Sequence, residues 1–520
     1  MTTLTDSNTT TTQNIPIDEE AAIFLKDIFT ETTNSVDKLR KFSDFIRANL
    51  SDFDSRNQLM VTYPYEILLC VIIFARMAGN ITKNDIREYW ELHNEEINKV
   101  FPFLFFQIPS TSTITRALHH IEAPYLQKKM LKLFSKQYNF FRHEDESYFV
   151  SDLSKRDVIG CDGQAIRATA RTRPSDGRLT GAMDITSLVS YNTGITLGHS
   201  IHQKKNQESK AIIDMIKDTD ITNAILTWDA LNTHEITFKA AIDKGADVFA
   251  CLKDNQGSLY DDCITAYTEY KKGHLLYTST ASQQIADYSH VEGGKHIVKN
   301  IIVLDAKLCI SKELLRKWEF IKSVSFIETE TTNLVTNKTS KSLRVFISTI
   351  PLDLKKYPNI AKDFLEISLK RWCVETLHWH LDMCFEQDRT SFRMIDSAFC
   401  STMINKMVMN VFNFAKNAYA NEEDRYKGVA TTRKLQHCCS GLFDYSLLLL
   451  EAFCKNDPKM LTQHELSRKF HFMKTEIYTG IYKDYHRQPY QGKNTIFKDC
   501  PLLDLLNNRN KEKKNKSTTS

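Results

Sequence analysis

The sequence lacks the features of a membrane, secreted or zinc-binding protein. Its longest apolar run, Ile67 to Ala75, is too short to cross a bilayer. Residues 1–13 are Thr-rich and polar, without the basic and apolar segments of a signal peptide. None of the twelve cysteines belongs to a CxxC pair, so neither a disulfide framework nor a zinc site is expected. We therefore expect a cytoplasmic protein with no membrane partner.

An excess of one charge and glycine-rich loops are also missing. The net charge is only +4 over 520 residues, so a nucleic acid would have to be held by local basic patches. The sixteen glycines are spread thinly and form no loop of the kind that cradles phosphate groups, which argues against an α/β protein binding a small ligand. The length predicts roughly three compact domains.

The composition and periodicity of the chain predict five regions. These are a disordered lead at 1–17, a helical DNA-binding or associated domain at 18–145, a catalytic core at 146–416 with a β-rich insertion at about 254–350, a C-terminal helical region at 417–506, and a basic disordered tail at 507–520. In the helical domain, a helix near Asn84–His93 and a second one starting after Pro109-Ser110 could read DNA. A plain helical bundle explains the same pattern at least as well.

The segment 158–252 combines strand patterns with helix patterns. The predicted strands are Val158–Asp162, Ile185–Tyr191, Ile195–His202, Ala224–Asp229 and Val248–Leu252, with helices at 209–217 and 234–243. Three strands followed by alternating helices and strands predict a mixed sheet flanked by helices.

Two acidic residues, Asp162 and Asp229, end predicted buried strands. A buried carboxylate without a partner is costly, and two at the same end of a sheet repel each other unless a cation lies between them. Mg²⁺ or Mn²⁺ would suit such hard oxygen ligands. Either Asp alone is better explained as a turn cap, with Gly163 supporting a turn at the first. The pair in this strand order favours a metal site.

A third carboxylate, Glu375, lies on a predicted helix that also carries Arg371, His378 and Asp382. Spacings of four, three and seven residues from Glu375 place all four side chains on one helical stripe. An Arg–Glu pair on a solvated face would explain the first two residues by themselves. Two tryptophans nearby argue against a purely solvated face.

Several motifs occur in an order and spacing that are specific as a set. They are Cys161-Asp162-Gly163-Gln164 with Arg167, Lys205-Asn206-Gln207-Glu208, Trp228-Asp229-Ala230, Leu252-Lys253-Asp254-Asn255-Gln256, Phe346-Ile347-Ser348 and the Arg371–Asp382 helix. With these motifs, the chain resembles the DDE transposases of bacterial insertion sequences, most closely the H-repeat-associated branch. The segment from Tyr63-Pro64 to Arg116 is similar to the helical domain that precedes that family's core.

The resemblance implies an α/β protein with a ribonuclease H-like mixed-sheet core, a β-rich insertion before the last carboxylate, a helical domain before the core and helices after it. It also implies that Asp162, Asp229 and Glu375 are catalytic and hold two Mg²⁺ (or Mn²⁺) ions. The predicted DNA-binding residues are Arg167, Arg171, Lys253, Arg371 and His378. Arg371 matches an arginine that contacts DNA phosphate in related transposases, and the others are candidate phosphate contacts. A solvated basic loop explains any one of these others equally well.

The predicted function is that of a transposase with endonuclease activity. It would cleave transposon ends in a metal-dependent reaction and join them to target DNA, acting on double-stranded DNA as a homodimer at the bacterial nucleoid. Two alternatives stay open, a metal-dependent nuclease that cuts without joining and a transposase-derived DNA-binding protein without catalysis. Three residues depart from the family pattern: Gln164 stands where many relatives have Lys, Ser368 where the wider superfamily has Tyr, and Asp382 where it has Lys.

Overall fold

The computed structural model describes residues 61–100, 107–121, 123–144, 153–170, 181–202, 207–273, 282–390, 392, 394–420, 432–441, 443–455 and 457–463. All of them fall in the compact unit Met1–His464. Across these ranges, none of the helices combines the length and the apolar character needed to span a bilayer. The predicted disordered lead, the predicted basic tail and Arg171 lie outside the described residues.

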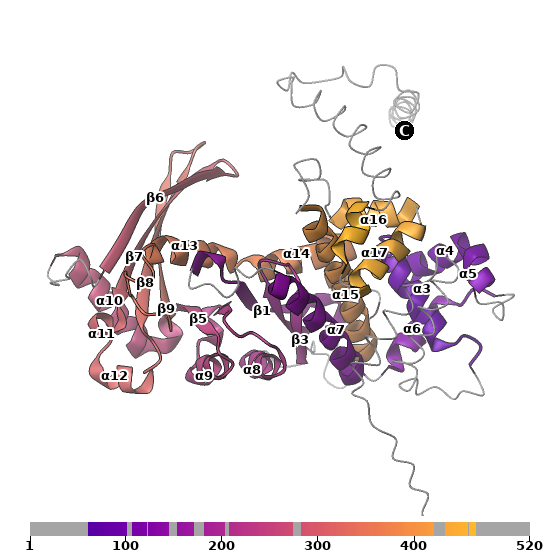
Figure 1. The fold of residues 1–520 in the computed structure, drawn as a ribbon, viewed down its shortest axis with the longest axis horizontal. Helices are drawn as coiled ribbons and strands as arrows, with labels where there is room; N and C mark the ends of the chain where they lie inside the picture. The colour runs from indigo at the N-terminus through magenta and orange to yellow at the C-terminus, as the bar shows by residue number, and fades with distance from the viewer. Residues whose placement is uncertain are drawn as a thin grey trace, which may run out of the picture. The chain divides into compact units, whose positions relative to one another are not determined.

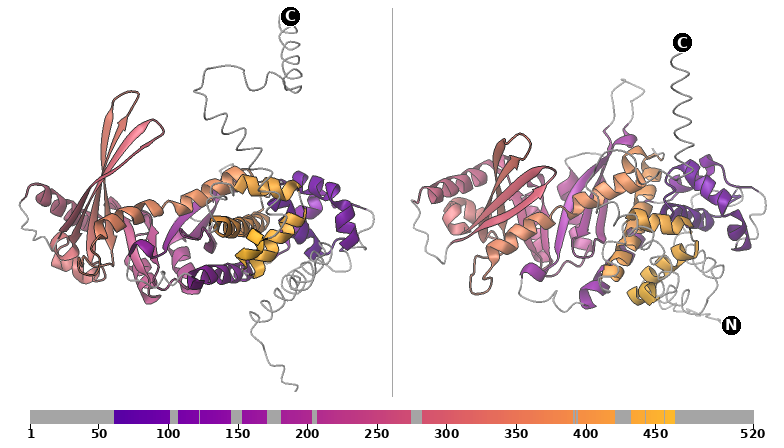
Figure 2. Two further views of the ribbon diagram at one scale, coloured as in Figure 1. Left: turned by 45° about the horizontal axis from the view of Figure 1, so that its top comes forward. Right: turned by 90° about the horizontal axis from the view of Figure 1, so that it is seen from above.

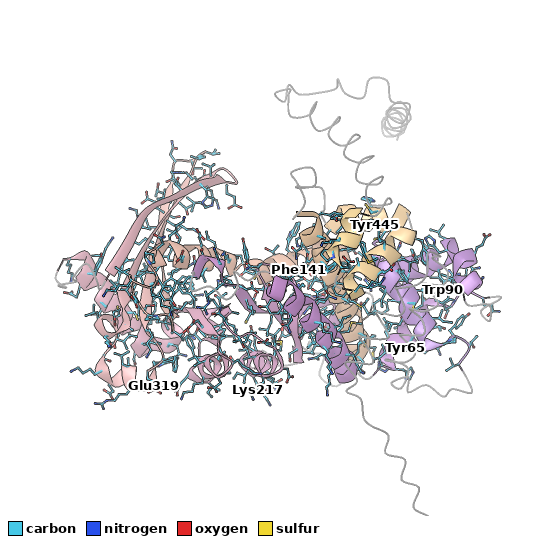
Figure 3. The ribbon with its side chains drawn as sticks, viewed as in Figure 1. Tyr65, Trp90, Phe141, Lys217, Glu319 and Tyr445 are labelled. Carbon is cyan, nitrogen blue, oxygen red and sulfur yellow. The ribbon has the colours of Figure 1, made fainter. Side chains whose placement is uncertain are left out.

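The N-terminal part is helical, as its periodicity predicts. Its helices are α3 (Tyr65–Met77), α4 (Lys83–Leu92), α5 (Asn94–Val100), α6 (Thr111–His119) and α7 (Ala123–Glu144). The Ser110 hydroxyl accepts from the Thr113 backbone N–H, so the predicted N-cap of α6 is confirmed. Helix α4 begins with a capping box between Thr82 and Asp85, and its Trp90 is buried (Figure 3).

One sheet of nine strands runs through the described residues, in the order β3-β2-β1-β4-β5-β9-β8-β7-β6. The strands are β1 (Val158–Ile166), β2 (Met183–Ser190), β3 (Thr196–His202), β4 (Ile225–Trp228), β5 (Asp247–Leu252), β6 (Ser282–Glu292), β7 (Lys295–Asp305), β8 (Ser323–Asn333) and β9 (Thr339–Ser348). Strands β1, β4 and β5 are parallel, whereas the pairs outside this centre are antiparallel. The predicted mixed sheet is confirmed.

Helices lie on both faces of this sheet. Helices α8 (Glu208–Asp218) and α9 (Glu235–Asp243) lie on one face, and α13 (Ile360–Lys370) and α14 (Cys373–Phe385) lie on the other (Figure 1). The mainly aliphatic core between α13 and the sheet contains a group of three phenylalanines, since Phe249 stacks on Phe346 at 4.7 Å and meets Phe364 at 4.9 Å between ring centroids. This packing anchors α13 to the centre of the sheet, and α14 follows directly.

Two details differ from the sequence-based expectation. Strand β1 does not end at Asp162, because its antiparallel pairing with β2 continues to Ile166. The segment expected to be β-rich also contains the helices α10 (Gly257–Lys271), α11 (Ala306–Cys309) and α12 (Lys312–Lys317). Its strands β6 to β9 join the main sheet through the pairing of β9 with β5. Figure 2 shows these strands and helices in two further views. Helix α10 buries Leu259, Cys263 and Ala266 at helical spacing, a signal outweighed in the sequence by the strand-like residues that follow.

The C-terminal helices are α15 (Ile395–Ala420), α16 (Thr432–Gly441), α17 (Phe443–Lys455) and α18 (Pro458–Gln463). Helix α15 packs against α3, α6 and α7 from the N-terminal part and also against β3. Phe141 of α7 meets Phe414 of α15 at 5.3 Å between ring centroids, and the hydroxyls of Tyr419 and Tyr445 are hydrogen-bonded (Figure 3). The N-terminal helices α3, α6 and α7 and the C-terminal helix α15 therefore pack together beside the sheet.

Candidate active site

Asp162 and Asp229 lie next to each other at one edge of the parallel strands. The last paired residues of β1 and β4 are Cys161 and Trp228, so the next residue on each strand is an aspartate in the same register. Burial along β1 changes at this point, from fully buried residues up to Cys161 to half-buried ones from Asp162 onward. The geometry thus brings together the first two predicted site residues.

Asp229 has the turn-cap role that its sequence left open, and its role as a metal ligand stays a prediction. Its Oδ1 accepts from the backbone N–H of Leu231 at 3.1 Å and of Asn232 at 3.3 Å, capping the short helix η7 (Ala230–Asn232). The turn-cap interpretation is therefore correct for Asp229. It is wrong for Asp162, because Gly163 lies inside β1, paired with Thr186, and forms no turn.

Glu375 reaches this edge because α14 packs very closely on β1. A methyl group at Gly160 would lie 2.8 Å from Cys373 Sγ and 3.2 Å from the Arg371 carbonyl, so only glycine permits this approach. The single helix expected over Arg371–Asp382 is in fact broken: α13 ends at Lys370, and α14 begins at Cys373. The break turns the chain so that Glu375 lies in the first turn of α14, with Arg371 Nη1 3.5 Å from its Oε1.

The acidic side chains interact electrostatically. Burial raises the pKa of Asp162 to about 7, and the charges of Glu208, Asp229 and Glu375 contribute to the rise. The pKa of Glu375 is also raised by burial and by Asp229, while Arg371 and Arg344 oppose the rise. Carboxylates that raise one another's pKa are crowded and would be stabilised by a cation.

This donor set fits a hard divalent cation, since it consists of carboxylate oxygens whose mutual repulsion a cation would relieve. In the described part of the chain, no group of three or more His, Cys, Asp or Glu side chains is positioned to hold an ion as the side chains stand. The carboxylates thus share one electrostatic environment without forming a closed ligand shell.

His378 faces the same aspartate, with Nδ1 3.8 Å from Asp162 Oδ2. Burial, together with the charge of Lys406, lowers the pKa of His378 to about 3. The imidazole is therefore neutral at physiological pH, and the contact is not an ion pair. Its predicted role in DNA binding stays a prediction, but a neutral ring with a side chain only 12% exposed brings no charge to a phosphate.

Three cations gather at the end of β5 beside the acidic residues. The pKa of the Cys251 thiol is raised by burial and lowered by Arg371, Lys253 and Arg344, so all three charges lie near it. Arg371 and Arg344 also flank the half-exposed Trp372, at 4.8 and 5.8 Å from its ring centroid. Positive charge next to a carboxylate cluster suits a polyanion whose phosphates must approach the cluster.

Arg167, another predicted DNA contact, pairs with an acidic residue after α14. It follows β1, its side chain is 84% exposed, and its Nε lies 3.4 Å from Asp388 Oδ2. Arg171 lies outside the described residues.

Sequence reasoning missed three residues, Glu208, Asn232 and Arg344. Asn232 is buried and its Nδ2 donates both to Glu208 Oε1 at 2.8 Å and to Asp229 Oδ1 at 3.1 Å. Glu208 belongs to the motif Lys205-Asn206-Gln207-Glu208, which contributed to the family resemblance. The motif gave no reason to expect the Glu208 side chain beside Asp162. Nothing in the spacing of Arg344 pointed to the site.

Comparison with known proteins gives a consistent result. The family model described as "DDE_Tnp_1-associated" matches residues 51–133. The protein named "Putative transposase YncI" of Escherichia coli O157:H7 is 24% identical over 387 residues, which cover 72% of this chain and 89% of that protein. The "H repeat-associated putative transposase YhhI" of Escherichia coli K12 is 23% identical over 365 residues, covering 69% and 87%. The chain is therefore similar in sequence to bacterial proteins named as putative transposases, among them H repeat-associated ones.

The resemblance found in the motifs is thereby confirmed, and it extends over 69–72% of this chain. Among solved structures, a piggyBac transposase synaptic complex with hairpin DNA matches with a TM-score of 0.37 and 10% identity, covering 93% of this chain and 88% of that one. A TM-score this low does not establish a shared fold.

Proposed function

We propose that this protein is a DDE-type transposase with a ribonuclease H-like core, which cleaves DNA at transposon ends and joins the freed ends to target DNA. The observation that carries the proposal is the meeting of Asp162, Asp229 and Glu375 at one sheet edge. The first two are in register on parallel strands, and the third is held there by the close packing of α14 on Gly160. Their mutual electrostatic coupling supports a shared function.

In the proposed reaction, Asp162, Asp229 and Glu375 would hold two divalent cations, Mg²⁺ or Mn²⁺. Bound cations supply the Lewis acidity that lets water, and then a 3′-hydroxyl, displace an oxygen at phosphorus. The contribution of the chain is to position and to neutralise charge, which is most of what phosphoryl transfer requires of a protein. Carboxylates with raised pKa values must lose their protons for this role, and a bound cation would favour the deprotonated form.

The cations near Cys251 are the proposed contacts to double-stranded DNA. Arg371, Lys253 and Arg344 lie near one another and near Asp229, so a phosphate held by them would lie close to the carboxylates. Replacing Arg371 with Ala should weaken DNA binding for all sequences alike and reduce the slope of log affinity against log salt by about 1. A homodimer on DNA, in which each copy holds one transposon end, completes the proposal.

The test uses the full-length protein and a supercoiled plasmid that carries the terminal repeats flanking its coding region. Cleavage and joining to a second plasmid are followed with Mg²⁺ or Mn²⁺ present. Asp162→Asn, Asp229→Asn and Glu375→Gln should each abolish cleavage while DNA binding persists. Glu313→Gln, which removes an equal charge from an exposed position on α12, should leave cleavage unchanged.

The outcomes separate the alternatives. Cleavage without joining would identify a nuclease on the same core. Binding of the repeats without cleavage by the unaltered protein would identify a DNA-binding protein without catalysis. Full cleavage by all three variants would overturn the assignment of the carboxylates.

A further inference from the structure

Glu208 is packed directly against the residue that follows Asp162. It begins α8, and its carboxylate covers Gly163 of β1. A methyl group at position 163 would lie 3.0 Å from Glu208 Cδ and 3.1 and 3.3 Å from its two oxygens. A methyl group at position 163 would therefore require this carboxylate to shift by a few tenths of an ångström, so Gly163 provides the space in which Glu208 lies.

Asn232 joins Glu208 to Asp229. The two N–H bonds of its Nδ2 are directed to two different carboxylates, Glu208 Oε1 at 2.8 Å and Asp229 Oδ1 at 3.1 Å. Its Oδ1 accepts from Ser209 Oγ at 2.9 Å. The amide cannot be flipped, because its oxygen would then face two acceptors and its nitrogen the hydroxyl. The orientation of Asn232 is thus determined by all three partners.

A favourable interaction with the helix dipole would by itself explain a glutamate in the first turn of α8. It does not explain why a buried asparagine, only 1% exposed, shares its amide between that glutamate and Asp229. Holding two carboxylates close together costs electrostatic energy, which a purely structural role would avoid by turning Glu208 toward solvent.

We propose that Asn232 is a positioning residue that holds Glu208 beside Asp229, and that Glu208 is a fourth acidic residue of the ion-binding site. This inference rests on the proposed function. The four negative charges of Asp162, Asp229, Glu375 and Glu208 would balance the four positive charges of two divalent cations. The negative charge of a DNA phosphate would then be balanced by the basic side chains near Cys251. Asp229 Oδ1 is occupied by its three donors, Leu231 N, Asn232 N and Asn232 Nδ2, so Oδ2 is the atom that faces an ion.

The test measures Mn²⁺ affinity of the full-length protein by calorimetry and by electron paramagnetic resonance, without DNA. Glu208→Gln keeps an acceptor for Asn232 but removes the charge, and it should weaken Mn²⁺ binding about tenfold, as loss of a partner around a metal site commonly does. Asp214→Asn removes the same charge from an exposed position on α8 and should leave the affinity unchanged. Circular dichroism verifies that both variants fold.

A double-mutant cycle tests the role of Gly163. Gly163→Ala should weaken Mn²⁺ binding by displacing the Glu208 carboxylate, and it should cause no further loss in a protein that already carries Glu208→Ala. Unchanged affinity in Glu208→Gln, with reduced affinity in Asp162→Asn, would overturn the inference and leave the proposed function standing. Unchanged affinity in Asp162→Asn, Asp229→Asn and Glu375→Gln would overturn both.

Discussion

Gln164 and Asp382 are hydrogen-bonded to each other, with Gln164 Nε2 donating to Asp382 Oδ2 over 2.8 Å. Two of the three residues that depart from the resembled transposases therefore form a pair. Gln164 Oε1 also accepts from Nε2 of the buried Gln387 at 3.0 Å. The Gln164 amide thus connects β1 with α14 and with the short helix that follows α14.

Replacing Gln164 with Ala should destabilise the protein by about 1–3 kcal/mol, because the Gln387 amide would stay buried without an acceptor. Chemical denaturation monitored by circular dichroism measures the change. Gln207→Ala, at an exposed position whose side chain makes no cap, is the matched control and should have little effect. Equal stability of both variants would contradict a structural role for the Gln164 bridge.

Gly160 controls the distance between α14 and β1. Gly160→Ala should lower stability by about 1–3 kcal/mol through overpacking and should weaken ion binding by moving Glu375. Adding Cys373→Ala removes the closest atom and should recover part of the loss. Gly181→Ala, where a methyl group meets nothing within 4 Å, should be neutral. If Gly160→Ala retained full stability and Mn²⁺ affinity, the close approach would not determine the position of Glu375.

The raised pKa of Asp162 predicts how stability depends on pH in the presence of a chelator. The folded protein binds a proton here up to about pH 7, whereas the unfolded chain loses it near 3.8. The native state therefore holds more protons between these values, and its stability decreases as pH rises through this window. Asp162→Asn lacks this dependence, so its stability relative to the unaltered protein should increase by up to about 1.4 kcal/mol per pH unit between pH 4 and 7. Parallel stability curves for the two proteins would refute the shift.

Lys406 gives a pH dependence of the opposite sign. It is buried on α15, donates to Ser187 Oγ and His199 Nδ1 at 2.6 Å each, and has its pKa lowered by burial to about 7. Between pH 7 and 10.5 the unfolded chain holds a proton that the native state has lost, so stability increases with pH. Compared with Lys406→Met, the unaltered protein should gain up to about 1.4 kcal/mol per pH unit in this window. The exposed substitution Lys217→Met should not change the slope, and a Lys406→Met curve parallel to the original would exclude a neutral lysine.

Local patterns in the sequence determined much of the fold. The order of apolar strands and helices from Val158 to Leu252 predicted the mixed sheet, because alternating and helical periodicities record which side of each element is buried. Ser110 predicted the start of α6 for a similar reason, since a cap acts within three residues. Strand position and the family motifs predicted Asp162, Asp229 and Glu375 as site residues, and their catalytic role stays a prediction.

Only the tertiary structure decided how these residues are arranged. The register of β1 against β4, the contact of α14 with Gly160 and the pairing of Gln164 with Asp382 join residues far apart in the chain, and no local pattern encodes such distances. Glu208 and Asn232 could not be predicted from the sequence for the same reason. Their proposed roles depend on contacts with Gly163 and Asp229, which form only when α8 packs on the sheet. The sequence specified the elements and the acidic residues. Packing brought the charges close enough to alter one another's pKa values.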